Sequence, residues 1–546
     1  MIRMLLALLA VLLMLWSAAE AASPYESAVP PTQATRIDEL VLSRLQRLGI
    51  EPANVCSDAA FVRRVYLDVI GTLPTGKETW EFLQDQNPNK RAALIDRVLA
   101  RPEFADYWAM KWSELLRVKA EFPINLWPNA VQAYHRWIHT SVKENMPYDK
   151  FVRTMLTANG SNFRVGQVNF YRAVQSKDPQ GIAVAVALTF MGERAEKWPK
   201  ERLDGMANFF TRVGYKSTSE WKEEIVFFDT VKTNAQGVVA QSATLPDGTV
   251  VKFSTGRDPR EQFADWLVSP RNPHFTRVIA NRVWSWLLGR GIIHEPDDIR
   301  PDNPPSNPEL LAYLEKQLIS SRYDVKHLFR LILNSQTYQF ASIPKTKTPE
   351  AEANFAFYPL RRLEAEVLID ALNQITGTTE QYASPIPEPF TFIPDDQRSI
   401  ALADGSITSS FLEQFGRPSR DTGLESERNS RPTADQRLHM LNSSHIQRKL
   451  ENSQKLQGLT RSKGDKPVEL ISGLYLMILS RLPTEAELKT AMTYSQISAP
   501  VSSPSVSSKK SKAGGSKSPY VSLKGREALV DIAWALINSP EFQYRH

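Results

Sequence analysis

Apolar residues recur at the three- and four-residue spacing of an amphipathic helix along most of this 546-residue chain. The clearest case lies between Thr35 and Leu48, where one face collects Ile37, Leu40, Val41, Leu45 and Leu48. Similar patterns occupy residues 61–70, 90–99, 130–144, 151–157, 180–190, 259–334 and 360–375. Strand-like alternation is concentrated at 225–255, where Asp247 and Gly248 are typical of a hairpin turn. The sequence therefore predicts a mainly α protein, a multi-helical bundle with a small β-rich insertion around 225–255.

Two short patterns occur near both ends of the chain in the same order. Tyr-Leu precedes Leu-Pro-Thr at 66–75 and again at 475–484, and Ala-Leu-Ile/Val-Asp precedes Pro-Glu-Phe at 93–104 and at 528–542. In both copies a glutamate follows the threonine by three residues, which is the pattern of a capping box at a helix start. Segments 267–275 and 333–338 repeat the ending, because a helix stops at a small polar residue and an aromatic follows. We expect stacked helical hairpins that bury this aromatic.

The first 21 residues have the layout of a signal peptide. Arg3 precedes an apolar run from Met4 to Trp16, and Ala19-Glu20-Ala21 supplies small residues for cleavage. The run is shorter than the roughly 20 residues of a membrane-spanning helix. We expect export to the periplasm or beyond with no transmembrane segment after cleavage; an uncleaved anchor is the alternative.

Composition shifts divide the mature chain into three parts. We predict an N-terminal helical domain at 35–224, a small β-rich segment at 225–256 and a C-terminal helical domain at 257–546. Within the last of these, 382–431 lacks regular periodicity and is predicted to be irregular. The Ser/Lys-rich stretch 500–518 is predicted to be a disordered insertion, and its lysines suit a solvated loop or contact with an anionic surface.

Charge and cysteine content exclude several classes of protein. The net charge is +6, but four lysines between 499 and 518 have no acid in that stretch, so the remainder carries about +2. This balance does not indicate a nucleic-acid-binding protein. The single cysteine, Cys56, excludes an intramolecular disulfide, a Cys-rich metal cluster and a c-type haem attached through Cys-x-x-Cys-His.

Two apparent motifs are better explained as structure. Residues 71–77 match the start of a phosphate-binding loop, but Glu78 replaces the hydroxyl that would reach magnesium. His135 and His139 share a helix face, yet Arg136 stands where a zinc protease needs a glutamate. No metal site is predicted.

Candidate functional residues gather in the second half of the chain, in two polar runs and one loop. The candidates for binding are Asn281, Arg282, Trp284, Arg290, Arg417 and Arg420, and those for catalysis are Asp297 and Asp298. One interpretation is an Arg–carboxylate network that fixes a helix against a loop. The alternative is a ligand or calcium site. Further along, the four-residue spacing of Arg362 and Glu366 predicts an ion pair within one helix.

Several of these segments resemble a known pair of domains. Residues 63–68 (RRVYLD) and 147–151 (PYDKF) resemble the planctomycete cytochrome-like domain of unknown function. Residues 264–275, 281–293, 303–311, 326–338 and 361–372, with 415–421, 439–444 and 537–542, resemble the planctomycete-specific domain that usually follows it. The resemblance implies an exported two-domain architecture but no established reaction.

The chain departs from that family at both thiol sites. Many relatives carry Cys-x-x-Cys-His after a Phe-x-Gly step, whereas here Phe190-Met191-Gly192 continues to Trp198 without cysteine or histidine. Many also carry cysteines after Phe-Gly-x-Pro-x-Arg, where this chain has residues 421–424 without any. No cofactor is therefore expected, and no c-type haem.

The leading hypothesis is an exported, non-catalytic binding or assembly component of the cell envelope, whose partner is an envelope protein or polymer. One alternative is a hydrolase of an extracellular polymer that acts through Asp297 or Asp298. The other is a haem- or metal-binding protein with non-cysteine ligands.

Overall fold

The computed structural model describes residues 23–233, 239–463, 466–497 and 526–546. The predicted signal peptide (1–21) and the predicted disordered insertion (500–518) lie outside these residues. The protein is mainly helical, as the periodicity predicts, and its strands form small sheets.

The helices follow one another along the whole described chain. The first half contains α2 (Arg36–Arg47), α3 (Asp58–Ile70), α4 (Gly76–Gln84), α5 (Lys90–Leu99), α6 (Glu103–Leu115), α7 (Pro128–Lys143), α8 (Tyr148–Leu156), α9 (Pro179–Met191) and α10 (Lys200–Ala207). The second half contains α11 (Pro259–Leu267), α12 (Pro273–Leu288), α13 (Pro308–Ser320), α14 (Val325–Leu333), α15 (Pro349–Ala353), α16 (Ala365–Thr376), α17 (Ser410–Gln414), α18 (Ala434–Asn442), α19 (Ser444–Glu451), α20 (Gln454–Lys463), α21 (Pro467–Ile478), α22 (Glu485–Ile497), α23 (Arg526–Ile537) and α24 (Pro540–Gln543).

Short 3-10 helices and strands lie between them. The 3-10 helices are η1 (Gly166–Tyr171), η2 (Ala195–Lys197), η3 (Asn208–Phe210), η4 (Ser399–Ala401) and η5 (Glu425–Glu427). The strands are β1 (Gly160–Ser161), β2 (Val213–Ser217), β3 (Glu224–Phe228), β4 (Ser242–Thr244), β5 (Val250–Lys252), β6 (Arg361–Arg362) and β7 (Tyr544–Arg545).

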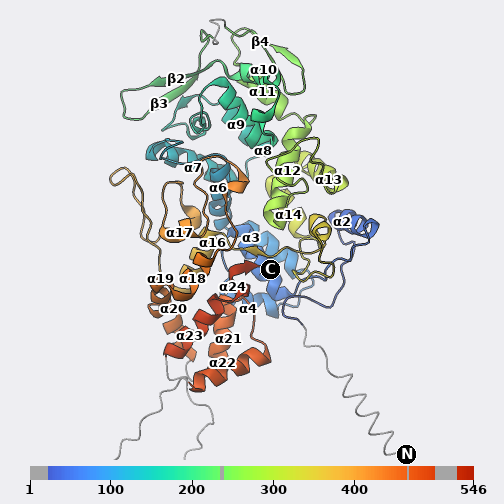
Figure 1. The fold of residues 1–546 in the computed structure, drawn as a ribbon, viewed down its shortest axis with the longest axis vertical. Coiled ribbons are helices and arrows are strands. Elements are labelled where there is room, and N and C mark those ends of the chain that lie inside the picture. Colours follow the sequence, from blue (N-terminus) through green and yellow to red (C-terminus); the bar gives the residue numbers. More distant parts are fainter. Residues whose placement is uncertain (1–22, 234–238, 464–465, 498–525) are drawn as a thin grey trace, which may run out of the picture.

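The strands near the middle of the chain form two small antiparallel sheets at one end of the molecule (Figure 1). The hairpin predicted around Asp247 is present, with Thr244 of β4 opposite Val250 of β5. The other sheet has the order β1–β3–β2. It begins before the predicted boundary at 225, because β2 already pairs along β3, with Tyr215 opposite Val226.

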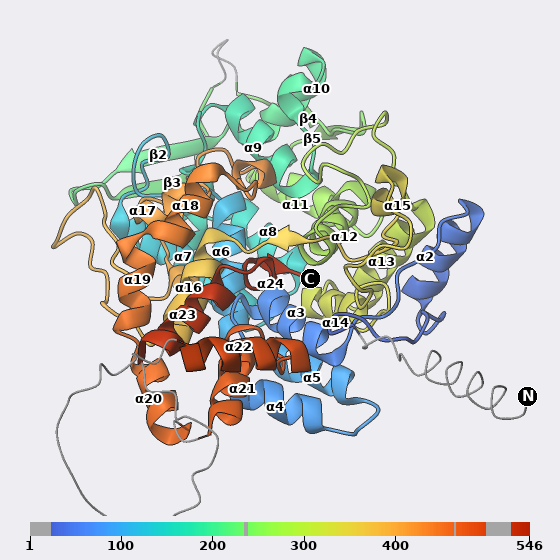
Figure 2. The ribbon, with the colours of Figure 1, turned by 60° about the horizontal axis from the view of Figure 1, so that its bottom comes forward.

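The two sequence copies at the ends of the chain adopt the same local structure. Thr75 caps α4 and Thr484 caps α22, and both capping boxes are formed as predicted. In each, the threonine hydroxyl accepts from the glutamate amide and the glutamate carboxylate accepts from the threonine amide. The copies also pack together, since α4 contacts α21, and Figure 2 shows these two helices side by side. As predicted, the aromatic that ends each unit is buried: Phe104, Phe275, Tyr338 and Phe542.

The end of the chain returns to its beginning. Arg63 of α3 donates from Nη1 to the Ile478 carbonyl (2.8 Å) and from Nη2 to the Phe542 carbonyl (2.9 Å), and β7 pairs with β6. The C-terminus therefore lies beside α3 in the middle of the molecule (Figure 1). Buried apolar residues from Ile37 to Phe542 form one continuous core. None of the described helices is long and apolar enough for a membrane crossing.

Candidate functional site

Arg282 and Asp297 form a closed ion pair inside the molecule. Asp297 Oδ1 lies 2.8 Å from Arg282 Nη2, and its Oδ2 accepts a hydrogen bond from the Glu425 amide at 2.6 Å. Arg282 also donates to the carbonyls of Leu188 and Thr189 at the end of α9. Asp297 is only 2% exposed. The pair joins α12, α9 and the segment around Glu425. This is the arrangement expected of an Arg–carboxylate network that fixes a helix against a loop.

Glu425 is a half-buried acid beside this pair. Burial, and then the neighbouring charge of Asp297, raise the pKa of Glu425 to about 7. Its carboxylate accepts from the Trp286 indole at 2.5 Å. The segment that carries Glu425 is thus held to Asp297 by its main chain and to α12 by its side chain.

Asn281 and Trp284, two further candidates, also have structural contacts. The Asn281 amide donates to the Ile293 carbonyl and accepts from the Ile293 amide, each at 2.9 Å. It thereby closes the loop that follows α12. Trp284 is fully buried, with its ring 5.0 Å from that of Phe355 in an edge-on contact.

Asp298 has partners different from those of Asp297. Its carboxylate pairs with Arg300 at 3.2 Å, and Arg300 also pairs with exposed Asp302 at 3.2 Å. Arg290, at the end of α12, is half-buried. The two adjacent aspartates therefore belong to an enclosed cluster and a surface cluster, respectively.

Arg417 and Arg420 fasten the irregular loop onto which they fold. Arg417 donates to the Asp404 carbonyl at 3.1 Å and pairs with Glu366 at 3.5 Å. Arg420 donates to the Ala403 carbonyl at 2.8 Å, and burial lowers its pKa to about 10. Both guanidinium groups therefore donate to backbone carbonyls of the protein itself.

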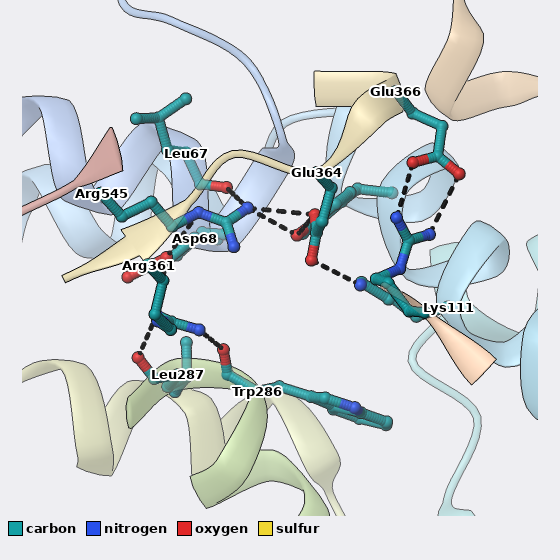
Figure 3. A network of polar contacts seen from close by, with 12 residues as sticks. Leu67, Asp68, Lys111, Trp286, Leu287, Arg361, Glu364, Glu366 and Arg545 are labelled. Atoms are coloured by element: carbon teal, nitrogen blue, oxygen red, sulfur yellow. Dashed lines mark hydrogen bonds and ion pairs between the residues drawn. The ribbon is translucent and has the colours of Figure 1, made fainter. Parts of the chain in front are cut away.

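Glu364 stands at the centre of a larger buried network, which Figure 3 shows from close by. Its Oε1 lies 2.6 Å from Lys111 Nζ on α6. Its Oε2 accepts from the Tyr107 hydroxyl at 2.7 Å and from Arg545 Nη2 at 3.1 Å. Burial alone would raise the pKa of Glu364, but Arg545 and Lys111 outweigh it and hold the pKa well below its usual value. Glu364 is therefore a buried carboxylate stabilised by two cations.

Asp68 of α3 forms the second centre of this network. Its Oδ1 pairs with Arg545 Nε and Arg361 Nη2, each at 3.2 Å. Its Oδ2 accepts from the hydroxyls of Tyr338 (2.9 Å) and Tyr358 (2.8 Å). Arg361 continues to two carbonyls at the end of α12, drawn in Figure 3. Arg545 thus joins Asp68 to Glu364.

Arg428 brings two further acids close to this network. It lies 2.7 Å from Glu366 and 2.5 Å from Glu114. Burial would raise the pKa of Glu366, but Arg428 outweighs it and brings the pKa to about 2.

The predicted helical pair of Arg362 with Glu366 is wrong, because Arg362 lies in β6 and donates instead to the Phe415 carbonyl at 2.6 Å.

Comparison with protein-family models matches two consecutive parts of the chain. Residues 36–211 match PSCyt2, described as a protein of unknown function (DUF1549), and residues 259–495 match PSD1, a protein of unknown function (DUF1553). Their order is the one that the sequence resemblance implies. The chain belongs to this two-domain planctomycete family. No curated protein and no solved structure gives a significant match.

The buried network crosses from the PSCyt2 domain to the PSD1 domain. Asp68 and Lys111 lie in the first, Glu364 and Glu366 lie in the second, and Arg545 follows the end of the second match. The network therefore fastens both domains and the C-terminal segment to one another. Sequence reasoning missed it, although Asp68 and Lys111 each interrupt an apolar helix face, which was an available signal.

Titratable side chains do not gather into a metal site in the described residues. No group of three or more His, Cys, Asp or Glu side chains there has suitable geometry. His135 is half-buried, and its burial lowers its pKa to about 3. His139 contacts Asp106 at 3.0 Å.

An apolar groove opens where the C-terminal segment crosses the PSD1 domain. Its volume is about 580 Å³. Aliphatic side chains of Ile343, Leu360, Met440 and Leu441 line it, together with Arg437, Asn538, Gln543, Tyr544 and His546. Leu360 is 59% exposed and Leu441 44% exposed. The protein thus presents to solvent an apolar surface that its own described residues leave uncovered.

Proposed function

We propose that this PSCyt2–PSD1 protein is an exported, non-catalytic binding or assembly component of the cell envelope. The observation that carries the proposal is the apolar groove, and its occupant is a segment of a partner polypeptide. Exposed apolar patches of this kind mark interaction surfaces, because leaving them in water is unfavourable.

The composition of the groove favours a polypeptide partner. Aliphatic residues from separate segments supply contact area, since Ile343 and Leu360 precede the C-terminal strand pair and Leu441 lies on α18. Arg437 and Gln543 supply polar groups beside them. Apolar contacts with a few polar groups around them are the usual anatomy of a protein–protein interface.

The charged clusters support a role without catalysis of its own. Asp297, Glu364 and Glu366 are buried, and each carboxylate is bonded to a cation. A catalytic acid or base has to reach a substrate proton at hydrogen-bond distance. These three groups instead have the contacts of structural ion pairs.

The test compares groove variants with a matched surface variant. Full-length protein is expressed in its native envelope, and the export prediction is checked by sequencing the mature N-terminus. Leu360→Asp and Leu441→Asp place a charge in the groove, whereas Val250→Asp changes a residue that is 66% exposed in β5, outside it. Cross-linking and purification identify bound polypeptides, and the candidate is then reconstituted with the purified chain.

We expect one polypeptide that binds wild type and Val250→Asp alike and binds both groove variants at least tenfold more weakly. Equal binding to all four proteins would contradict the groove as the interface. A purified chain that turns over a substrate, with turnover lost on substitution of Asp297, would contradict the non-catalytic role.

A further inference from the structure

Each of the two sequence copies contains an arginine that binds two glutamates. In the first copy, Arg101 binds Glu103 through Nε (3.2 Å) and Nη2 (2.5 Å), and binds Glu78 at 2.7 Å. In the second copy, Arg481 binds Glu541 through Nε (2.7 Å) and Nη2 (2.8 Å).

Arg481 also binds Glu487, at 2.7 and 2.8 Å. Glu78 and Glu487 are the equivalent capping-box residues, and Glu103 and Glu541 are the equivalent residues of Pro-Glu-Phe. The arginines come from different places in the two copies, yet the same trio of side chains results. We call these trios the first and second Arg–Glu clusters.

The clusters differ in what lies over them. In the second cluster the Tyr25 hydroxyl donates to Glu541 Oε2 at 3.0 Å. Burial and the Glu541 charge raise the pKa of Tyr25, so the phenol remains a neutral donor. A carboxylate that is bound by an arginine in this way can thus still accept a hydrogen bond from a hydroxyl group.

In the first cluster the Tyr66 hydroxyl contacts Glu78, whereas Glu103, the counterpart of Glu541, faces a hollow whose described lining contains no tyrosine. Glu78, Arg101 and Glu103 from the first family match line this hollow together with Asn373, Asp396 and Arg398 from the second. Its volume is about 360 Å³, within the roughly 300–1,000 Å³ range of ligand pockets. The hollow lies between the PSCyt2 and PSD1 domains, and such junctions are preferred places for binding sites.

The walls of the hollow are fixed before any ligand arrives. Gln374 of α16 accepts from the Thr72 hydroxyl at 2.8 Å and donates to the Leu73 carbonyl at 2.9 Å. These two bonds tie the PSD1 side directly to the PSCyt2 side. A preformed site loses less conformational entropy when it binds a ligand.

The chemistry of the lining selects the class of ligand. Four carboxyl groups (Glu78, Glu103, Asp370 and Asp396) face two guanidinium groups (Arg101 and Arg398), which disfavours anions such as phosphate or sulfate. Leu73 is the one aliphatic residue in the described lining, and no aromatic side chain is present there, which disfavours nucleobases and apolar ligands. Carboxylates, amides and guanidinium groups together both accept from and donate to hydroxyl groups.

We propose that this hollow binds a neutral saccharide, whose hydroxyls take the place at the first Arg–Glu cluster that Tyr25 takes at the second. This inference is independent of the apolar groove, because it rests on a different surface and a different ligand. The site would let the protein hold an envelope glycan while the groove holds a polypeptide.

The experiment measures retention of the purified full chain on an array of neutral oligosaccharides that also carries sulfated ones. Thr379→Trp fills the hollow from an exposed lining position, and Asp396→Ala removes an exposed lining carboxylate. Asp395→Ala is the matched control, since Asp395 is the exposed neighbour outside the described lining. Tyr25→Phe tests the second cluster, where the protein itself supplies the hydroxyl from a half-buried tyrosine at the edge of the apolar groove. Hydrogen exchange of wild type with the best-retained oligosaccharide locates the site.

We expect at least one neutral oligosaccharide to be retained by wild type, Asp395→Ala and Tyr25→Phe, with at least tenfold weaker retention by Thr379→Trp and Asp396→Ala. The bound sugar should slow amide exchange at 72–78 and 396–399. Failure to retain any neutral oligosaccharide would overturn the proposal. So would preference for sulfated sugars, or equal retention by the two lining variants and wild type.

Discussion

Replacing Glu364 by glutamine tests whether the buried network stabilises the fold. The substitution keeps the shape of the side chain but removes the charge that faces Lys111 Nζ at 2.6 Å and Arg545 Nη2 at 3.1 Å. The amide also directs an N–H₂ group toward one of the donors that the carboxylate accepted from. Because Glu364 is only 8% exposed, water does not replace the lost interaction.

The expected loss is about 3–5 kcal/mol of unfolding free energy, the usual effect of breaking one buried ion pair and leaving its partner charged. Glu39→Gln is the control, because its pair with Arg36 is as short, at 2.6 Å, but the two side chains are 42% and 58% exposed. An exposed pair contributes about 0–1 kcal/mol.

Urea unfolding, followed by circular dichroism and by tryptophan fluorescence, measures both free energies. In a double-mutant cycle, Lys111→Met should recover part of the loss caused by Glu364→Gln, because it removes the unpaired cation. If Glu364→Gln destabilises the protein no more than Glu39→Gln, the network does not stabilise the fold and the reasoning is refuted.

Three further predictions follow from single residues. Gly71 ends α3 at φ +58°, and a Cβ there would lie 2.6 Å from the Tyr107 ring, so Gly71→Ala should lower the unfolding free energy by more than the roughly 1–2 kcal/mol that backbone strain alone costs. Gly49 has φ +67° and open space around it, so Gly49→Ala should lower the unfolding free energy by the strain alone. Equal urea midpoints for the two variants would contradict the clash with Tyr107. The pKa of Glu366 in the folded protein is about 2 against an ordinary 4.5, so the stability it contributes is present above about pH 4.5 and is lost as the pH falls through 2. Glu366→Gln should therefore make the urea midpoint depend less on pH across that range. An unchanged pH dependence would count against the Arg428 pair. Asp297→Asn should lower the unfolding free energy by about 3–5 kcal/mol, and Asp298→Asn, beside half-exposed Arg300, by less than about 1; the reverse order in calorimetry would contradict the burial of the Arg282 pair.

Local features of the fold could be predicted from the sequence because they depend on neighbouring residues. The helical spacing at 35–48 corresponds to α2, and the Asp247-Gly248 turn corresponds to the β4–β5 hairpin. The capping boxes at Thr75 and Thr484 are present for the same reason, since each one lies within four consecutive residues.

The candidate site could be predicted only where its partners are close in sequence. Arg282 and Asp297 are 15 residues apart, and the polar run indicated Asp297 or Asp298 as a partner for a buried arginine without deciding between them. Arg545 lies 181 residues from Glu364, and no local pattern indicates that pairing. Arg362 and Glu366 have the spacing of a helical ion pair, but they do not form one. Arg362 lies in β6, which pairs with β7, and its guanidinium donates to the Phe415 carbonyl instead.

Buried Arg–carboxylate pairs join the PSCyt2 domain, the PSD1 domain and the C-terminal segment into one structural unit. Differential scanning calorimetry of the full chain should therefore show a single cooperative unfolding transition for wild type, with its midpoint lowered by Glu364→Gln. Two separate transitions in wild type, of which Glu364→Gln shifts neither, would contradict this joining of the domains.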